Sequence, residues 1–160
     1  MIKKTNNIFL VFILLIISIA LIVAFIIQYG LGYQPCKLCL YERIPYILSI
    51  LLIIKILFST KYKKIILLTL ALIFIMSTFL SFYHFGIERG FFNESALCLS
   101  ENFSETLSKE QLLDQLKKSN ISCKTVDFKI LGFSLASINA IFSFILSVIF
   151  VQMFKNYEKN

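Results

Sequence analysis

The sequence predicts an all-α membrane protein, a bundle of four transmembrane helices with two loops on the outer side of the membrane. Apolar residues make up 58% of the chain and charged residues only 16%, against about 45–50% and 25% in soluble domains. A soluble fold of 160 residues has too little interior to hide this much apolar surface. Four apolar segments also approach the length, about 20 residues, that crosses the hydrocarbon core of a bilayer. Lipid must therefore cover much of the chain.

The four predicted helices follow the apolar segments in chain order. The first covers residues 8–27 and lacks the short core and small-residue cleavage site of a signal peptide. The second covers residues 40–58, with Pro45 in its first turn, where proline is tolerated. The third and fourth cover residues 65–85 and 133–154. Their Ile and Phe content would favour strands in water, but a single segment in lipid satisfies its backbone only as a helix.

Two longer loops, residues 28–39 and 86–132, connect these helices within a single domain that we assign to residues 1–160. The second loop contains Ser108-Lys-Glu-Gln111, a capping-box pattern that predicts a short helix over residues 108–120. Leucines give that helix one apolar face. It would lie flat on the membrane surface or pack on the loop itself, and the sequence does not decide between the two.

The distribution of charge predicts the orientation of the bundle. Both chain ends and the short connection at residues 59–64 are rich in lysine, whereas the basic and acidic residues of the two longer loops and the adjoining helix ends balance. Short basic flanks face the cytoplasm, so we expect cytoplasmic termini and both longer loops outside. The net charge of +7 is thus a topology signal, and we expect contact with membrane lipid and none with nucleic acid.

All four cysteines fall in the outer loops: Cys36 and Cys39 in the first, Cys98 and Cys123 in the second. The outer side of a bacterial membrane is oxidising, so they form two candidate disulfides. Cys36-Lys-Leu-Cys39 has the C-x-x-C spacing of thiol–disulfide exchange, and its place before a helix favours a thiolate at Cys39. A structural staple is the alternative for the second pair. We predict no metal site, because the chain has one histidine and no second C-x-x-C.

Three polar residues accompany the C-x-x-C. Arg43 follows Cys39 by one helical turn, and it serves either as an interface anchor or as a guanidinium donor to a polar head group held against Cys39. His84, the single histidine, ends the third predicted helix at the depth of Arg43, with a structural and a functional role both open. Glu42 is expected to point elsewhere, solvated or ion-paired.

These residues resemble a known family. The run from Cys36 to Arg43, C-K-L-C-L-Y-E-R, resembles the C-x-x-C-x-Y-E-R signature of the DsbB family of disulfide bond formation proteins in bacterial inner membranes. The run Y-H-F-G-I-E at residues 83–88 is similar to the end of that family's third helix, and L-G-F-S at residues 131–134 to the start of its fourth. The chain departs from the family in having no tryptophan, so aromatic contacts that the family often makes with tryptophan fall to Phe or Tyr, or are absent. In the related vitamin K epoxide reductase family the loop pair comes before the C-x-x-C. This opposite order argues against that family.

The resemblance implies a membrane thiol–quinone oxidoreductase that reoxidises a periplasmic, thioredoxin-fold, DsbA-like dithiol protein and so supports disulfide bond formation. All four cysteines would be catalytic. Cys98 would form the mixed disulfide with the partner, Cys123 would release the oxidised partner, and electrons would pass to Cys36 and Cys39. Cys39 would deliver them to a quinone, ubiquinone or menaquinone, near Arg43 and His84.

The resemblance places the protein in the bacterial inner membrane, as a multi-pass protein with periplasmic cysteines. The competing class is a non-catalytic membrane protein whose loops are held by two structural disulfides. A low thiol pKa and a bound quinone would distinguish the oxidoreductase from it.

Overall fold

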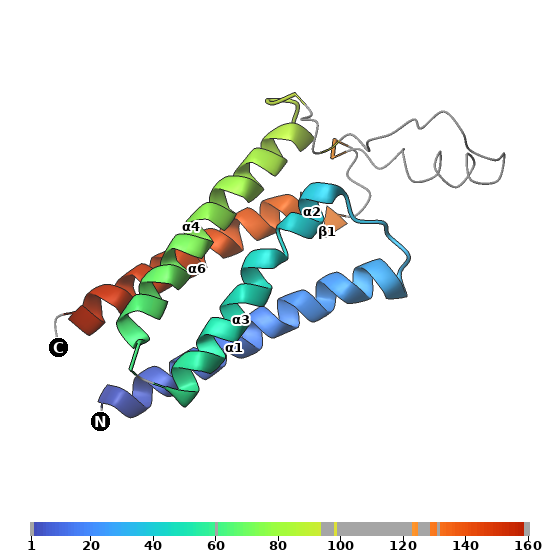
Figure 1. Ribbon diagram of the computed structural model, residues 1–160. Helices are drawn as coiled ribbons and strands as arrows, with labels where there is room; N and C mark the ends of the chain where they lie inside the picture. Colours follow the sequence, from blue (N-terminus) through green and yellow to red (C-terminus); the bar gives the residue numbers. More distant parts are fainter. Residues whose placement is uncertain are drawn as a thin grey trace, which may run out of the picture.

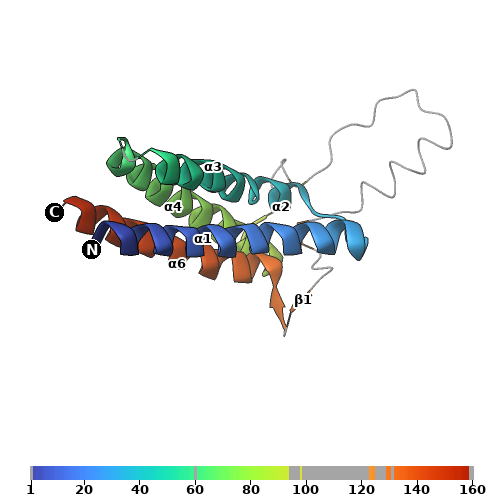
Figure 2. The same ribbon diagram turned by 90° about the horizontal axis from the view of Figure 1, so that it is seen from below.

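The structure is a bundle of long helices. The start and the end of the chain lie together at one end of this bundle. The computed structural model describes residues 2–59, 61–93, 98, 123–124, 129–130 and 132–158. Its long helices are α1 (Ile2–Phe25), α3 (Ile44–Phe58), α4 (Lys63–Glu88) and α6 (Leu135–Glu158). Figure 1 and Figure 2 show them side by side, with the start of α1 and the end of α6 opposite the end that carries the short helix α2 (Lys37–Tyr41).

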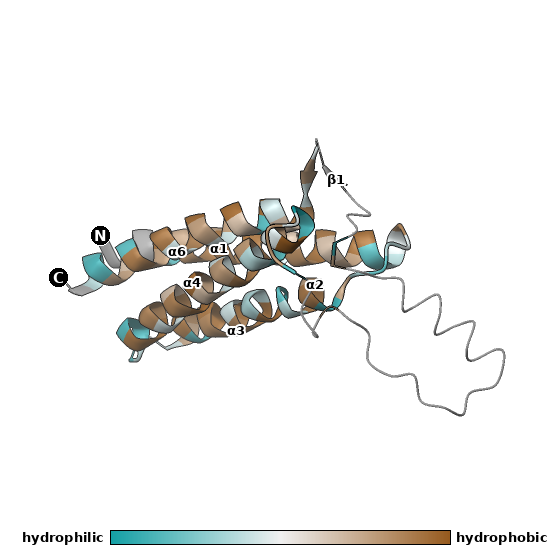
Figure 3. Ribbon diagram, turned by 90° about the horizontal axis from the view of Figure 1, so that it is seen from above, coloured by the Kyte–Doolittle hydropathy of each residue, from teal (hydrophilic) through white to brown (hydrophobic). Residues whose placement is uncertain are grey.

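Three helical segments are long and apolar enough to cross a membrane. They are Asn7–Gly30, Lys63–Glu88 and Leu135–Tyr157, judged by length and composition within the described part of the chain. In Figure 3 apolar residues cover most of each helix, and polar residues gather toward the ends of the bundle. The expected helical, multi-pass membrane architecture is therefore confirmed. At 15 residues, α3 is shorter than the usual span of about 20, so the predicted fourth crossing stays a prediction.

The second predicted helix, residues 40–58, differs from the structure at its outer end. The chain forms α2, leaves the helix at Glu42 and Arg43, and begins α3 at Ile44. Pro45 explains the break, because it has no N–H to donate to the carbonyl of Tyr41 and its ring would collide with that carbonyl in a continuous helix. The break lies between Cys39 and Arg43. The prediction that Arg43 follows Cys39 by one helical turn assumes a continuous helix, which the break interrupts.

The other helix ends also have local causes. The first helix continues through a π-helical turn, η1 (Ile26–Gly30), so it extends beyond residue 27. The fourth begins at Leu135, where the Ser134 Oγ accepts a hydrogen bond from the backbone N–H of Ser137 at 3.2 Å and caps the helix. Before it, β1 (Lys129–Ile130) and β2 (Phe133–Ser134) pair antiparallel. The predicted helix over residues 108–120 lies outside the described residues.

Two features hold the bundle together near its long axis. The rings of Phe74 on α4 and Phe150 on α6 stack with centroids 5.5 Å apart, and both side chains are fully buried. Small serines then let the same two helices approach closely, with the Oγ atoms of Ser77 and Ser143 at 3.1 Å. This contact fixes α6 against α4, and so fixes the side chains that α6 presents to the outer end of α4.

Gly86 allows the chain to fold back where α4 ends. A Cβ atom at this position would collide with the ring of Phe92, while the N–H of Phe91 donates to the Gly86 carbonyl at 2.8 Å. Phe92 in turn packs against Tyr83, with ring centroids 5.5 Å apart. The last turns of α4, which carry His84 and Glu88, are thereby covered by the segment that follows them.

Candidate thiol–disulfide site

Both cysteine pairs lie in one buried cluster at the end of the bundle that carries α2. Cys98 and Cys123 are joined by a disulfide with their Cα atoms 5.6 Å apart, whereas Cys36 and Cys39 are free thiols. Cys36, Cys98 and Cys123 are buried together with Leu38 and Ile87, and Cys39 packs against this group. The structure therefore brings together the four cysteines that the sequence singled out.

The fold of α2 determines how the first pair is presented. Cys36 is the N-cap residue, with extended backbone, and its Sγ accepts a hydrogen bond from the N–H of Cys39 at 3.1 Å. Cys36 is buried and Cys39 is partly buried. The sulfur at the helix start is thus the Cys36 Sγ, which is where the backbone amide stabilises negative charge.

His84 contacts the same sulfur. Its Nε2 lies 3.5 Å from the Cys36 Sγ, and its Nδ1 lies 3.0 Å from the Glu42 Oε1. Glu88, one turn later on α4, places an oxygen 3.9 Å from Nε2. Only 2% of His84 is exposed, so the imidazole is held between a carboxylate and a thiol.

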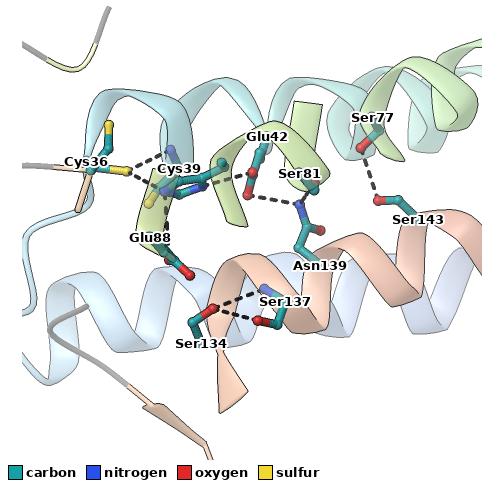
Figure 4. Close-up of polar contacts among 12 residues, drawn as sticks. Cys36, Cys39, Glu42, Ser77, Ser81, Glu88, Ser134, Ser137, Asn139 and Ser143 are labelled. Carbon is teal, nitrogen blue, oxygen red and sulfur yellow. Dashed lines mark hydrogen bonds and ion pairs between the residues drawn. The ribbon is translucent and has the colours of Figure 1, made fainter. Parts of the chain in front are cut away.

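Glu42 is ion-paired and buried, so of the two expectations for this residue the solvated one is wrong. It is 7% exposed, and its second oxygen, Oε2, accepts a hydrogen bond from the Asn139 Nδ2 at 3.0 Å. Figure 4 shows this carboxylate directed toward Asn139, with Cys39 and Cys36 farther along the same segment. Glu42 lies in the turn between α2 and α3, where its carboxylate contacts both His84 and Asn139.

Asn139 is a site residue that the sequence reasoning missed. It lies in α6 and donates from Nδ2 to Ser81 at 2.7 Å as well as to Glu42, and its Oδ1 accepts from the Tyr46 hydroxyl. A usable signal was present, because a polar amide within an apolar span is costly unless it meets partners and usually marks a function.

Arg43 connects the start of α3 to the first helix. Its Nη1 donates to the Gln28 Oε1 at 2.5 Å and its Nη2 to the Ala24 carbonyl at 3.4 Å. The guanidinium carbon also lies 5.1 Å from the centroid of the Phe25 ring. These contacts give the partly buried charge two polar partners and an aromatic ring.

A cavity of about 450 Å³ joins these residues, within the roughly 300–1,000 Å³ of small-molecule sites. Its polar side carries the thiols, acids and bases of the site: Cys36, Cys39, Glu42, Arg43, His84, Glu88 and Asn139, with Cys123 also on the wall. Its apolar side is formed mainly by α1 and α6. Ile19 and Ile138 line this side and are also 58% and 37% exposed, so the cavity reaches the apolar outer surface between these helices.

The environment stabilises a thiolate at Cys36 and disfavours one at Cys39, the reverse of the expectation from helix position. Hydrogen bonds from Cys39, and then the neighbouring His84, lower the pKa of Cys36 to about 5 against the desolvation that opposes them. The side-chain hydrogen bond to Cys36 and then burial raise the pKa of Cys39. Both residues lie outside the three candidate membrane spans. The expected Cys39 thiolate is therefore wrong, because the cap position belongs to Cys36.

We expect Cys36 in the reduced protein to react with an alkylating reagent with a midpoint near pH 5, against 9.0 for an ordinary thiol. Because the pKa is lowered, the thiolate is present above that midpoint and is lost as the pH falls through it. Cys39 should stay protonated and react slowly over the same range. Mass spectrometry of the alkylated peptides across pH measures both rates, and an ordinary midpoint at Cys36 would contradict the geometry.

The same atoms form a possible metal-ligand set. The ligand atoms of Cys36, Cys39 and His84 lie within 4.8 Å of one another, and the carboxylate on Nδ1 of His84 is the usual partner of a metal-binding imidazole. In this structure the Cys36 Sγ forms hydrogen bonds with His84 and with the N–H of Cys39, and we do not assign these atoms as metal ligands. The absence of a metal from the functional site stays a prediction.

Two comparisons with known proteins agree with this site. Residues 6–153, nearly the whole chain, match the family described as "Disulfide bond formation protein DsbB". The chain is also 34% identical over 162 aligned residues to "Uncharacterized protein RP370" of Rickettsia prowazekii (strain Madrid E), covering 99% of this chain and 94% of that protein. Matched over nearly its full length, with paired cysteines buried at one end of a helical membrane bundle, the chain belongs to the DsbB family of disulfide bond formation proteins.

Proposed function

We propose that the protein is a thiol–quinone oxidoreductase that reoxidises a periplasmic DsbA-like dithiol protein and passes the electrons to a membrane quinone. The observation that carries this proposal is the placement of both cysteine pairs in one buried cluster, with the first pair on the wall of an apolar cavity. Family membership implies a disulfide oxidoreductase. The geometry supports an exchange between the pairs and an electron acceptor in the cavity.

The proposed exchange balances through two disulfides. A partner thiolate attacks the Cys98 sulfur, the Cys98–Cys123 bond breaks, and Cys123 leaves as a thiolate. The partner's second thiolate then displaces Cys98 and departs as a disulfide, which refines the release step that the family resemblance suggested. The Cys98–Cys123 dithiol next reduces a Cys36–Cys39 disulfide by the same chemistry. Two electrons thus arrive at the first pair for each partner oxidised.

The residues on the cavity wall fit a quinone. The apolar side suits a ring with an isoprenoid tail, and the Arg43 guanidinium offers charged N–H donors to a carbonyl oxygen. A bound quinone, ubiquinone or menaquinone, would supply an acceptor for two electrons and two protons. The protein's own contribution is to hold a thiolate at Cys36, a proton-carrying imidazole at His84 and a donor at Arg43 around one space.

We further propose four membrane crossings in a single domain of residues 1–160, with α3 as the fourth. The chain ends would be cytoplasmic and the cysteines periplasmic in a bacterial inner membrane. The lysine-rich chain ends and the connection between α3 and α4 support this orientation. Both chain ends lie opposite α2 in the bundle, so a single orientation satisfies the lysines and the cysteines together.

The direct test mixes the purified protein with a reduced DsbA-type protein and a soluble ubiquinone or menaquinone analogue. Reduction of the quinone, followed by its absorbance, should equal the thiols lost by the partner. Organic extraction of the protein as isolated should also yield a membrane quinone. A protein with two structural disulfides would give neither result, and that outcome would refute the proposal.

We expect Arg43→Ala to raise the KM for quinone about 5- to 150-fold, the equivalent of roughly 1–3 kcal/mol for a charged hydrogen bond left unmade. Arg43→Lys should rescue only in part, because lysine lacks the planar fork. Gln28→Ala is the matched control, since it removes the partner of Arg43 and keeps its charge. Steady-state assays with varied quinone at saturating partner protein measure the effect. An unchanged KM for quinone would reduce Arg43 to an interface anchor.

A further inference from the structure

The side chain of Asn139 connects α6 with the thiol site through three hydrogen bonds. Its two donor bonds go to Glu42 and Ser81, and its oxygen accepts from Tyr46. Figure 4 shows the amide nitrogen between Glu42 and Ser81. A flipped amide would turn its oxygen toward the carboxylate and lose both donor bonds, so the contacts select one orientation.

Glu42 is divided between two partners by this contact. Its Oε2 receives the Asn139 N–H at 3.0 Å, and its Oε1 lies 3.0 Å from the Nδ1 of His84. A carboxylate at Nδ1 selects the tautomer with the proton on that nitrogen. The lone pair of Nε2 then faces the Cys36 Sγ, 3.5 Å away. Three consecutive contacts therefore lead from α6 to the thiol on the far side of the site.

We propose that Asn139 is a positioning residue that holds Glu42 so that the Glu42–His84 pair takes the proton of Cys36. In that step the Cys36 S–H bond breaks, an Nε2–H bond forms, and the products are a thiolate and an imidazolium paired with the carboxylate. No electrons move, and the proton returns when Cys36 is protonated again. The inference deepens the proposed function, because it assigns to the fourth long helix a role in activating the C-x-x-C.

The loss of the Asn139 donor should act at Cys36 through Glu42. A buried carboxylate that loses a donor holds its charge less well and is free to rotate away from Nδ1. Among the described residues, the ionisable groups that face His84 are Cys36 and Cys39 from α2 and its cap, Glu42 from the helix break, and Glu88 from its own helix. Asn139→Leu changes none of these groups, so it isolates the positioning contact.

The experiment titrates Cys36 in reduced, quinone-free protein without a partner. A Cys98→Ser/Cys123→Ser background leaves only the first pair to titrate, and thiolate absorbance together with site-resolved alkylation gives the midpoint. Asn139→Leu should raise the Cys36 midpoint by about one to two pH units, equivalent to a ten- to hundred-fold loss of thiolate reactivity in the acid range. Ser147→Ala is the control on the same helix, two turns deeper. The Ser147 Oγ donates to the Phe144 carbonyl of its own helix, so this change should leave the midpoint unchanged.

A double-variant cycle separates positioning from a general loss of packing. Glu42→Gln should raise the midpoint by itself, and Asn139→Leu should add nothing further in that background. Additive shifts would overturn the proposal. If Asn139→Leu does not fold, Asn139→Ala removes the donor without adding charge or bulk and should raise the midpoint in the same way. An unchanged midpoint in the variant that folds would also overturn it.

Two separate measurements, the Cys36 midpoint and the rate of quinone reduction, distinguish this inference from the proposed function. A protein that shows the Asn139-dependent shift but never reduces quinone would refute the oxidoreductase role and leave the positioning contact standing. A protein that turns over normally while its Cys36 midpoint ignores Asn139 would refute the positioning role alone.

Discussion

Cys98→Ser is expected to reduce turnover with a reduced DsbA-type partner and quinone to the uncatalysed rate. In the proposed sequence Cys98 provides the sulfur that the partner attacks, and its disulfide with Cys123 is the bond that must break. Without the Cys98 sulfur, the Cys36–Cys39 pair receives no electrons. Cys36 and Cys39 lie in a buried cluster, so the partner does not reduce them directly. A steady-state assay of quinone reduction reads the loss directly. Full turnover in this variant would make the second disulfide a structural staple.

A capture experiment locates the attacked sulfur. In the Cys123→Ser protein, Cys98 is a free thiol that can displace the leaving group from a partner protein carrying one activated cysteine. The product is a covalent complex visible on a non-reducing gel. The Cys98→Ser/Cys123→Ser protein is the matched control and should give no such complex, although it keeps Cys36 and Cys39. Equal capture by both proteins would place the partner contact at the first pair.

Cys36→Ser and Cys39→Ser should remove sustained turnover and leave one round of partner oxidation. The Cys98–Cys123 disulfide remains in these variants and accepts two electrons, but no route then leads from it to an acceptor in the cavity. Without quinone, the fully oxidised native protein should oxidise up to two partners through its two disulfides, and each variant only one. Thiol counting after a single mixing step measures this difference.

The contrast between one and two equivalents also tests the order of the relay. If Cys36→Ser supported continuous quinone reduction, electrons would be leaving the second pair by another path. If it oxidised no partner at all, the second pair would depend on the first for its own disulfide. Either result would contradict a linear relay in which Cys98–Cys123 acts before Cys36–Cys39.

The sequence located the cysteines, the long helices and the family, because each depends on local pattern. Apolar length identifies spans without any knowledge of what they contact, and the C-x-x-C is a contiguous motif. The break before α3 was also local, since Pro45 stands in the sequence, but the proline was interpreted as a first-turn residue of a longer helix. That interpretation left Glu42 either solvated or ion-paired and did not identify its partners, His84 and Asn139.

The rest of the site depends on contacts between distant parts of the chain. Asn139 meets Glu42 across 97 positions and Ser81 across 58, and no periodicity within α6 indicates either partner. The preference for a thiolate at Cys36 over Cys39 depends on His84, 48 positions away, and on which cysteine caps a five-residue helix. Such features follow from how α4 and α6 are packed, which helix-by-helix reasoning does not determine.

The apolar wall of the cavity bears on how the acceptor's concentration should be expressed. Ile19 and Ile138 belong both to that wall and to the exposed apolar surface of two candidate membrane spans. A long-tailed acceptor would therefore reach the thiols by lateral diffusion and need not leave the bilayer. Saturation would then follow its mole fraction among the lipids. Diluting the protein's liposomes with buffer that contains the partner protein at the same concentration should leave the rate of quinone reduction per protein molecule unchanged. Fusing the liposomes with quinone-free lipid should lower that rate.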